Sequence, residues 1–443
     1  MKAIFNALLT DRKFRHKIML MLLIIAVVRI ISYIPVPGID ASVFKEWMNA
    51  NGNDAFNLFS AFTGGSFENF SIMALGITPY ITASIVIQLL EVAIPAMAKM
   101  QRDGESGRRQ IERITIVFGI ILAAVQSIAM AIGFGKNGLI ADMTFIKGLI
   151  ITLSITGGAA LSIYFAKLLT DKSIGNGTSV LLVINIISRV PAEIASLYKQ
   201  FVKGKATWKA ALAIVIIAAL ILFIIMLVSA MDSAFRMIPV QYSRKMSIQG
   251  QASEIGGIPV KVGILSVMPV IFASSFFAFP QLIAAITGKG YGSGMSKVIL
   301  EAVNQSNWFN PSKPAYTLGA VFYLILMALM AYFYAPIALN PAEVAEAIRK
   351  QGGVIPGVRL GKETEKYIEK VSYSMAFIGT AMLTIVVLIP MILTGVFGVS
   401  SVLGGTSIII IVGVQADMAS QIILEAKQPL EDRLIYSGEE SNG

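Results

Sequence analysis

The chain alternates long apolar segments with short polar ones along almost its whole length. A helix needs about 20 apolar residues to cross the hydrocarbon core of a bilayer. The pattern therefore predicts an all-α polytopic membrane protein with ten spanning helices. Their expected positions are residues 18–34, 72–95, 114–134, 147–169, 179–197, 210–231, 262–286, 315–337, 371–394 and 405–425. The fifth is the weakest, because Arg189 and Pro191 interrupt it.

The second segment differs from an ordinary lipid-facing helix. From Asn69 to Leu90 it reads NFSIMALGITPYITASIVIQLL, with Gly76 and Pro79 inside it. Proline removes a backbone N–H and clashes with the carbonyl four residues earlier, so we expect a kink at Pro79. The segment also carries a line of polar residues: Thr78, Thr82, Ser84 and Gln88. A kinked span with a polar line is typical of the border of a cavity.

Composition agrees with a polytopic membrane protein. Of the 443 residues 56% are hydrophobic and 14% charged, and the mean hydropathy is +0.74, too high for a soluble chain. An even number of spans puts both termini on one side, and most of the basic residues predict that this side is the cytoplasm. The predicted external loop 198–209 is basic as well and argues against this orientation. The net charge of +10 fits apposition to anionic lipid, so we do not infer direct nucleic-acid binding from it.

The sequence contains few residues or motifs that could support catalysis or metal binding. It has no cysteine and one histidine, His16, so we expect no metal, cofactor or catalytic triad. Phosphate-loop and nucleophile-elbow motifs are absent, and no span carries paired carboxylates. Among the ionisable residues within the predicted spans, Arg29 can snorkel to the outer surface, and Asp417 is an ion site or an interfacial residue. We therefore expect that the protein is not an enzyme.

Two of the predicted cytoplasmic loops are long and patterned. Residues 232–261 predict a short hairpin around a Gly-rich middle. In 340–370, Asn340 and Pro341 suit a helix start and Gly352 a helix end, and a second helix is expected near Thr364. Between these helices a tight turn would present Arg359 far from the membrane. Topology alone explains the basic charge, but docking sites for a cytosolic partner better explain the length.

Two function classes fit these features. Broken helices and a five-plus-five division are typical of secondary transporters for small solutes, built from inverted repeats. A channel for a large substrate comes second on these features alone.

Short sequence motifs reverse the order of these two function classes. Eight of them resemble the SecY/Sec61-alpha family in the same order along residues 12–425: IPVPGID, the segment 69–90, GESGRRQIERIT, IGNGTS, IPVQYSRK, IPVKV with MPVIFASSFFAFP, GGVIPGVRLGKETEKYI and GGTSIIIIVGVQAD. The chain departs from the family pattern at Leu360, where proline is usual, and at Met237 and Gly263.

The resemblance implies a clamshell of two inverted, pseudo-symmetric five-helix halves. The halves would be 18–200, with a plug at 59–71, and 210–425, with cytoplasmic loops 232–261 and 340–370. Residues 1–17 and 426–443 would be cytoplasmic ends. The implied function is a protein-conducting channel in a bacterial plasma membrane. It would translocate unfolded secretory polypeptides and release membrane segments sideways into lipid.

The resemblance also assigns residues to four sites. The pore ring would be Ile77, Ile81, Leu182, Ile186, Ile271 and Ile410. The plug would include Phe59, Phe62, Gly64, Gly65, Phe67 and Asn69, and its glycines would let it move. The lateral gate would include Pro79, Thr82, Gln88 and Ser274, with an interhelical hydrogen bond from Gln88 favouring closure. Motor or ribosome docking would use Arg108, Arg109, Arg236, Arg244, Lys245 and Arg359.

The implied partners are small SecE-like and SecG-like membrane subunits, the SecA motor ATPase, the ribosome with its RNA, precursor polypeptides with their signal sequences, and membrane lipid. Energy would come from the motor or the ribosome. This is consistent with the absence of a nucleotide-binding motif from the chain.

Overall fold

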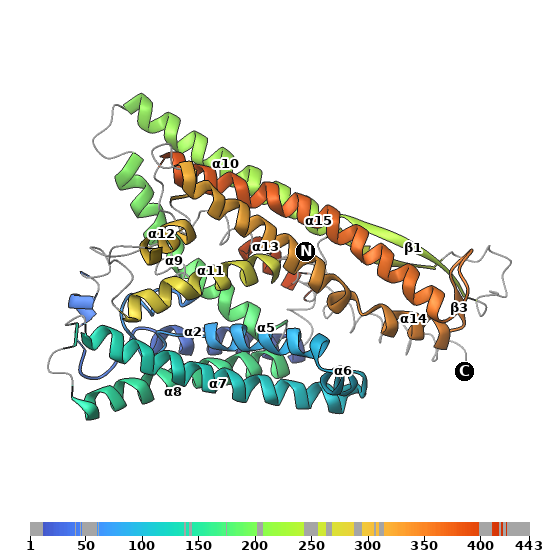
Figure 1. Ribbon diagram of the computed structural model, residues 1–443, viewed down its shortest axis with the longest axis horizontal. Helices are drawn as coiled ribbons and strands as arrows, with labels where there is room; N and C mark the ends of the chain where they lie inside the picture. The colour runs from blue at the N-terminus through green and yellow to red at the C-terminus, as the bar shows by residue number, and fades with distance from the viewer. Residues whose placement is uncertain are drawn as a thin grey trace.

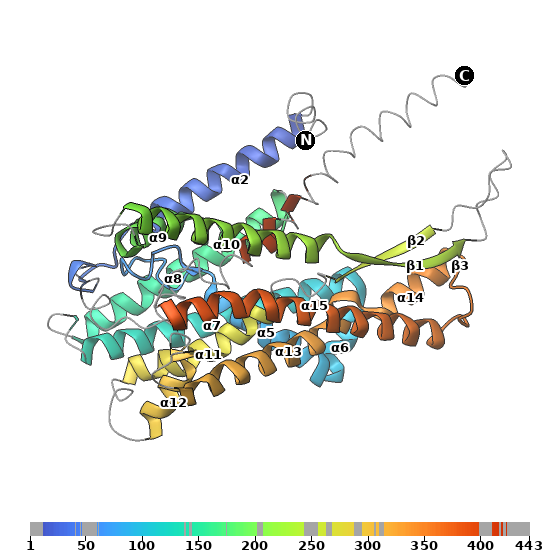
Figure 2. The ribbon, with the colours of Figure 1, turned by 90° about the horizontal axis from the view of Figure 1, so that it is seen from above.

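The computed structural model describes residues 12–39, 41–44, 46, 60, 62–136, 139–140, 144–173, 175–201, 207–242, 256–262, 268–287, 295–304, 307–309, 314–397, 410–415, 418–419 and 422. Long helices run alongside one another and a small β-sheet lies at one end of them (Figure 1). We call this the sheet end of the molecule. Figure 2 shows the same sheet, with α14 and one end of α15 beside it, projecting beyond the other long helices.

The first half contains five long helices: α2 (Arg12–Ile31), α5 (Thr78–Ala93), α7 (Gly104–Lys136), α8 (Phe145–Lys172) and α9 (Gly177–Phe201). The α7 helix packs against both α5 and α8, and α8 also packs against α2 and α9. Glycine permits a close approach of α7 to α5: a Cβ on Gly119 of α7 would lie 3.3 Å from Tyr80 Cα of α5. These contacts bury one face of each helix and leave the outer faces apolar and exposed, as lipid requires.

The helix does not kink at Pro79, and that prediction was wrong. The α5 helix begins at Thr78, so Pro79 lies in its first turn, where the missing N–H has no intrahelical partner to lose. The span therefore starts later than residue 72, after turns in which Gly76 has a φ of 52°. The sharp bend follows α5 instead: α6 (Pro95–Arg102) runs at 105° to it.

The second half contains α10 (Thr207–Ser233), α11 (Met268–Thr287), α13 (Thr317–Leu339) and α15 (Lys362–Phe397). The α13 helix packs against α11 and α15, and α10 packs against α15. The short elements α12 (Met295–Val303) and η3 (Pro314–Tyr316) lead into α13. Trp308 is fully buried among these elements, and its indole N–H donates to the carbonyl of Ala302 at 2.7 Å.

Every predicted span overlaps helical residues, the last of them at 410–415. Within the described ranges, five helices are long and apolar enough to cross a membrane, or six if α5 and α6 form one bent span. Two shorter apolar helices, Gly177–Ala192 and Met268–Phe277, lie in the predicted fifth and seventh spans. The many-spanning helical architecture agrees with the prediction, while the number ten stays a prediction.

The sheet joins the two long loops. The predicted hairpin is present: β1 (Phe235–Tyr242) pairs antiparallel with β2 (Gly256–Lys261). The other edge of β1 pairs with β3 (Gly353–Val354), which belongs to the second loop. The strand order is β2-β1-β3, and the sequence pattern did not indicate β3.

The second loop otherwise follows its prediction. The α14 helix (Pro341–Lys350) has proline in its first turn, and α15 begins close to Thr364. Asn340 occupies the N-cap position without a side-chain cap, because its amide donates to the Glu343 carboxylate instead.

Candidate functional site

The plug segment, predicted at 59–71 and described at residues 60 and 62–71, forms a series of tight turns. Gly64 and Gly65 have φ angles of 66° and 85°, in the left-handed region that favours glycine. Backbone hydrogen bonds close the turns, with Gly65 N donating to Ser60 O at 2.8 Å and Ser71 N donating to Ser66 O at 2.9 Å. The two glycines thus fix the turn, and whether they also let the segment move stays a prediction. Phe59 lies outside the described residues.

Aromatic side chains anchor one side of the plug segment. Phe67 and Phe70 are fully buried and form edge-to-face contacts with Phe44, while Phe70 also meets Phe134 of α7. Such pairs are favourable beyond the area that they bury. Asn69 is half-buried beside them, and its N–H donates to the Gly65 carbonyl at 3.1 Å. The carboxyl-terminal part of the segment is therefore held in the core of the first half.

Polar side chains hold the other side against α2 and α9. Arg29 of α2 donates to Asn185 Oδ1 at 3.1 Å and to the carbonyl of Gly64 at 3.0 Å. Asn185 of α9 in turn donates to the carbonyl of Phe62 at 2.9 Å. These bonds satisfy backbone carbonyls that the turns of the plug segment leave without partners within the segment. The interpretation of Arg29 as a snorkelling residue was wrong, because the guanidinium has partners within the protein.

An ion pair adds to this attachment. Arg189 of α9 bonds to the hydroxyl of Ser60 and to the carboxylate of Glu68, both in the plug segment. The side chains of Arg189 and Glu68 are 13% and 23% exposed, so water screens this pair far less than a surface pair. Sequence analysis missed Arg29, Asn185, Arg189 and Glu68 as site residues. For Arg29 and Arg189 the signal was there, since an ionisable residue inside a predicted span is by default a candidate for function.

The six predicted ring residues belong to, or pack against, two adjoining hydrophobic clusters. Leu182 and Ile186 of α9, Ile271 of α11 and Ile410 are buried in one hydrophobic cluster, and half-buried Ile81 of α5 packs against it. Ile77, at the start of α5, belongs to the adjoining cluster, against which Ile81 also packs. Four segments far apart in sequence thus contribute aliphatic side chains to these two clusters. Their role as a pore ring stays a prediction.

The plug segment shares a hydrophobic cluster with four of these residues. Phe62 is 6% exposed and belongs to the same hydrophobic cluster as Leu182, Ile186, Ile271 and Ile410. The segment therefore spans from the aromatic core of the first half to the aliphatic cluster between the halves. A displacement of the segment would expose apolar surface at both ends.

The predicted gate residues lie on α5 and α11, and α11 contacts both α5 and α7. Pro79 is buried, and Thr82 donates to the carbonyl of Thr78 at 3.1 Å. Ser274 of α11 shares a 3.0 Å hydrogen bond with the Tyr323 hydroxyl of α13, within its own half.

The expected interhelical bond of Gln88 is absent from the described residues. Its amide donates instead to Ser84 Oγ in the same helix at 3.3 Å, because residues four apart lie on one helix face. Its amide oxygen is buried without a partner in the described part of the chain. That part of the gate prediction was wrong for this conformation.

The predicted docking residues that the structure describes are exposed at the sheet end. Arg236 lies on β1, Arg359 lies in the turn before α15, and Arg108 and Arg109 lie near the start of α7. The hydroxyl of Thr364 donates to the carbonyl of Arg359 at 2.9 Å, which ties the turn to the first turn of α15. Arg244 and Lys245 lie outside the described residues.

Comparison with known proteins agrees with the family resemblance of the sequence motifs. The SecY family model matches residues 71–419. The chain is 35% identical to the protein translocase subunit SecY of Staphylococcus epidermidis over 434 residues, which cover 96% of this chain and 97% of the relative.

Two solved structures share the fold. One describes how the plug domain of a SecY protein stabilises the closed state of the translocation channel, with a TM-score of 0.64, 18% identity and coverage of 93% of this chain and 92% of the other. The second is Sec61 in a canine ribosome–channel complex from the endoplasmic reticulum, with a TM-score of 0.63, 17% identity and the same coverage. With the sequence match over nearly the whole length, these findings show that the chain belongs to the SecY family.

Proposed function

We propose that the protein is a channel that conducts unfolded polypeptides across a membrane and releases apolar segments sideways into lipid. One observation carries the proposal: aliphatic side chains from four separate segments of both halves belong to two adjoining hydrophobic clusters, and Phe62 of the plug segment belongs to the larger of them. Its membership of a family of channel subunits supports the same function and indicates that the protein is not an enzyme.

The aliphatic cluster suits a moving chain. Such side chains offer a passing polypeptide no hydrogen bonds or charges to hold it, yet they exclude water and ions when they meet. The five ring residues other than Ile81 are at most 7% exposed, which corresponds to the closed state. The plug segment, held by Arg29, Asn185 and Arg189, adds a second barrier.

The sheet end faces the cytoplasm in this proposal, and the membrane is a bacterial plasma membrane. A related channel, Sec61, is seen in a complex with the ribosome. We infer that Arg359, Arg236, Arg108 and Arg109 form the surface that docks the ribosome or the SecA motor ATPase. SecE-like and SecG-like subunits would complete the complex in the membrane.

Reconstitution tests the proposal. The chain, purified with its small membrane subunits, would be placed in anionic-lipid vesicles with the motor ATPase and a secretory precursor. We expect ATP-dependent protection of the precursor from added protease, and none with a precursor that lacks its signal sequence. Vesicles that protect no precursor, although the complex is intact, would contradict the proposal.

A further inference from the structure

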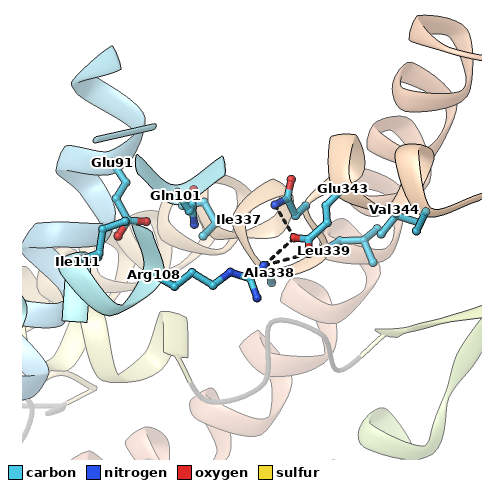
Figure 3. Close-up of a pocket in the computed structure, with 11 residues that line it drawn as sticks. Glu91, Gln101, Arg108, Ile111, Ile337, Ala338, Leu339, Glu343 and Val344 are labelled. Carbon is cyan, nitrogen blue, oxygen red and sulfur yellow. Dashed lines mark hydrogen bonds and ion pairs between the residues drawn. The ribbon is translucent and has the colours of Figure 1, made fainter. Parts of the chain in front are cut away.

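A cavity of about 510 Å³ lies between the two halves at the sheet end (Figure 3). From the first half, Glu91 of α5, Gln101 of α6 and Arg108 of α7 line it. From the second half, Asn340 and Glu343 line it at the start of α14. Any parting of the halves at this end must change the cavity.

One ion pair spans the cavity. Arg108 Nη2 donates to both carboxylate oxygens of Glu343, at 2.9 and 2.8 Å, and Asn340 donates to the same carboxylate at 3.0 Å. The side chains of Arg108 and Glu343 are 60% and 57% exposed. Water screens so exposed a pair, which makes it weak and easily broken. It therefore suits a contact that must open and close.

A second carboxylate lines the same cavity without a cation. Glu91 is only 7% exposed, and its carboxylate has no hydrogen bond or ion pair in the described part of the chain. A buried carboxylate without a partner is costly when charged. Figure 3 shows Glu91 on the side of the cavity formed by α5 and α7, across from Glu343. Arg108 and Glu91 therefore lie in the same half of the molecule, whereas Glu343, the present partner of Arg108, lies in the other half.

We propose that Arg108 is a two-position clasp that determines which signal sequences open the channel: it holds Glu343 across the halves when the gate is closed and Glu91 within its own half when the gate is open. The inference rests on the proposed function. When the halves part, α14 carries Glu343 away while Arg108 stays on α7, which packs against α5. Glu91 then supplies the guanidinium with a partner, so that opening loses little electrostatic energy. A weakly binding signal sequence is the one most affected by so small a difference.

The single substitutions Glu343→Gln and Glu91→Gln test the clasp, because they should shift the export of weak-signal precursors in opposite directions. The complete complex would be assayed in membranes for export of two precursors, one with a weakly and one with a strongly hydrophobic signal sequence. The ratio of weak-signal to strong-signal export is the readout, since a docking defect lowers both precursors together. We expect Glu343→Gln to raise this ratio about two- to fivefold, the range that an exposed ion pair supports. Glu91→Gln is expected to lower the ratio by a similar factor.

Glu346→Gln is the matched control. Glu346 lies on α14 like Glu343, but it pairs within the helix with Lys350, whose hydrogen bond and charge lower the pKa of Glu346. Of these two glutamates on the same helix, Glu343 contacts the other half through Arg108, whereas Glu346 pairs within α14. We expect the control to leave the export ratio unchanged.

An exchanged pair tests the role of Glu91 without altering it. Arg108→Glu combined with Glu343→Arg keeps opposite charges across the halves but places a carboxylate next to Glu91 in the first half. Like charges then oppose the open state, so the ratio should fall below that of the wild type.

The outcomes distinguish a failure of the clasp from a failure of the proposed function. If the wild type exports both precursors and the two glutamine variants either match it or shift the ratio in the same direction, the clasp is wrong and the channel stands. If the wild-type complex exports neither precursor, the proposed function fails, and the clasp fails with it.

Discussion

At the residue scale, Gly64 sets how closely the plug segment approaches α9. Its φ of 66° strains any other residue, and an added Cβ would overlap the guanidinium of Arg29 and lie 3.0 Å from Asn185 Cα. The close approach in turn lets Arg29 and Asn185 reach the carbonyls of Gly64 and Phe62. One missing side chain therefore allows the polar contacts that hold the segment in place.

Gly64→Ala should loosen the plug segment. The strained backbone costs of order 1–3 kcal/mol, and the overlap with Arg29 disrupts its bonds. We expect a higher ion leak through closed channels in vesicles, measured as the decay of an imposed ion gradient.

Gly157→Ala is its control. Gly157 lies within α8, and a Cβ there would meet no atom within 4 Å. Alanine in a helix is favourable by roughly 0.5–1 kcal/mol over glycine, so the leak should stay at the wild-type level. Equal leaks in the two variants would show that the Gly64 contact does not contribute to the seal.

At the element scale, the β-sheet couples the two long loops. The β1 strand takes β2 from its own loop on one edge and β3 from the loop that carries Arg359 on the other. The turn after β3 is tied to α15 through Thr364, and α15 continues into the predicted membrane region. A partner that binds this turn therefore holds the end of a long helix.

Arg359→Glu should impair motor-driven export and leave the protein folded. The side chain is exposed, so its replacement disturbs no core packing, but it reverses the charge offered to the partner. We expect at least a tenfold loss of motor-driven export, equivalent to about 1.4 kcal/mol of docking energy.

Lys350→Glu makes the same charge change on α14 in the same loop and should have a much smaller effect. Lys350 is exposed and pairs only locally, with Glu346. Normal motor-driven export by the Arg359 variant, or equal losses in both variants, would contradict a specific docking role for Arg359.

At the scale of the whole molecule, the length of the apolar segments predicted the helices, because a helix that spans a membrane satisfies its backbone polar groups within itself. The same local reasoning failed at Pro79, where the sequence does not show whether proline lies in the first turn or the middle of a helix. It also failed for β3, which is two residues long and depends on pairing with a distant strand. A long-range partner explains Arg29, which bonds to the plug segment, and nothing near Arg29 in sequence decides that choice. Gln88 bonds instead to Ser84 four residues away in its own helix, a local pairing that competes with the expected interhelical bond.

A disulfide crosslink at Ile410 tests the central claim most directly. The chain has no cysteine, so Ile410→Cys introduces a single thiol at the fully buried centre of the aliphatic cluster. A precursor with one cysteine, stalled by a folded carboxyl-terminal domain, supplies the second. Val125→Cys, on the exposed apolar face of α7, is the control.

The account predicts a crosslink at Ile410 and none at Val125, because the stalled chain passes between the two halves. If a precursor that is demonstrably being exported, with motor and partner subunits present, never crosslinks to Ile410, the polypeptide does not take this route. The aliphatic cluster would then be ordinary packing, and a transporter of small solutes would again be the leading interpretation.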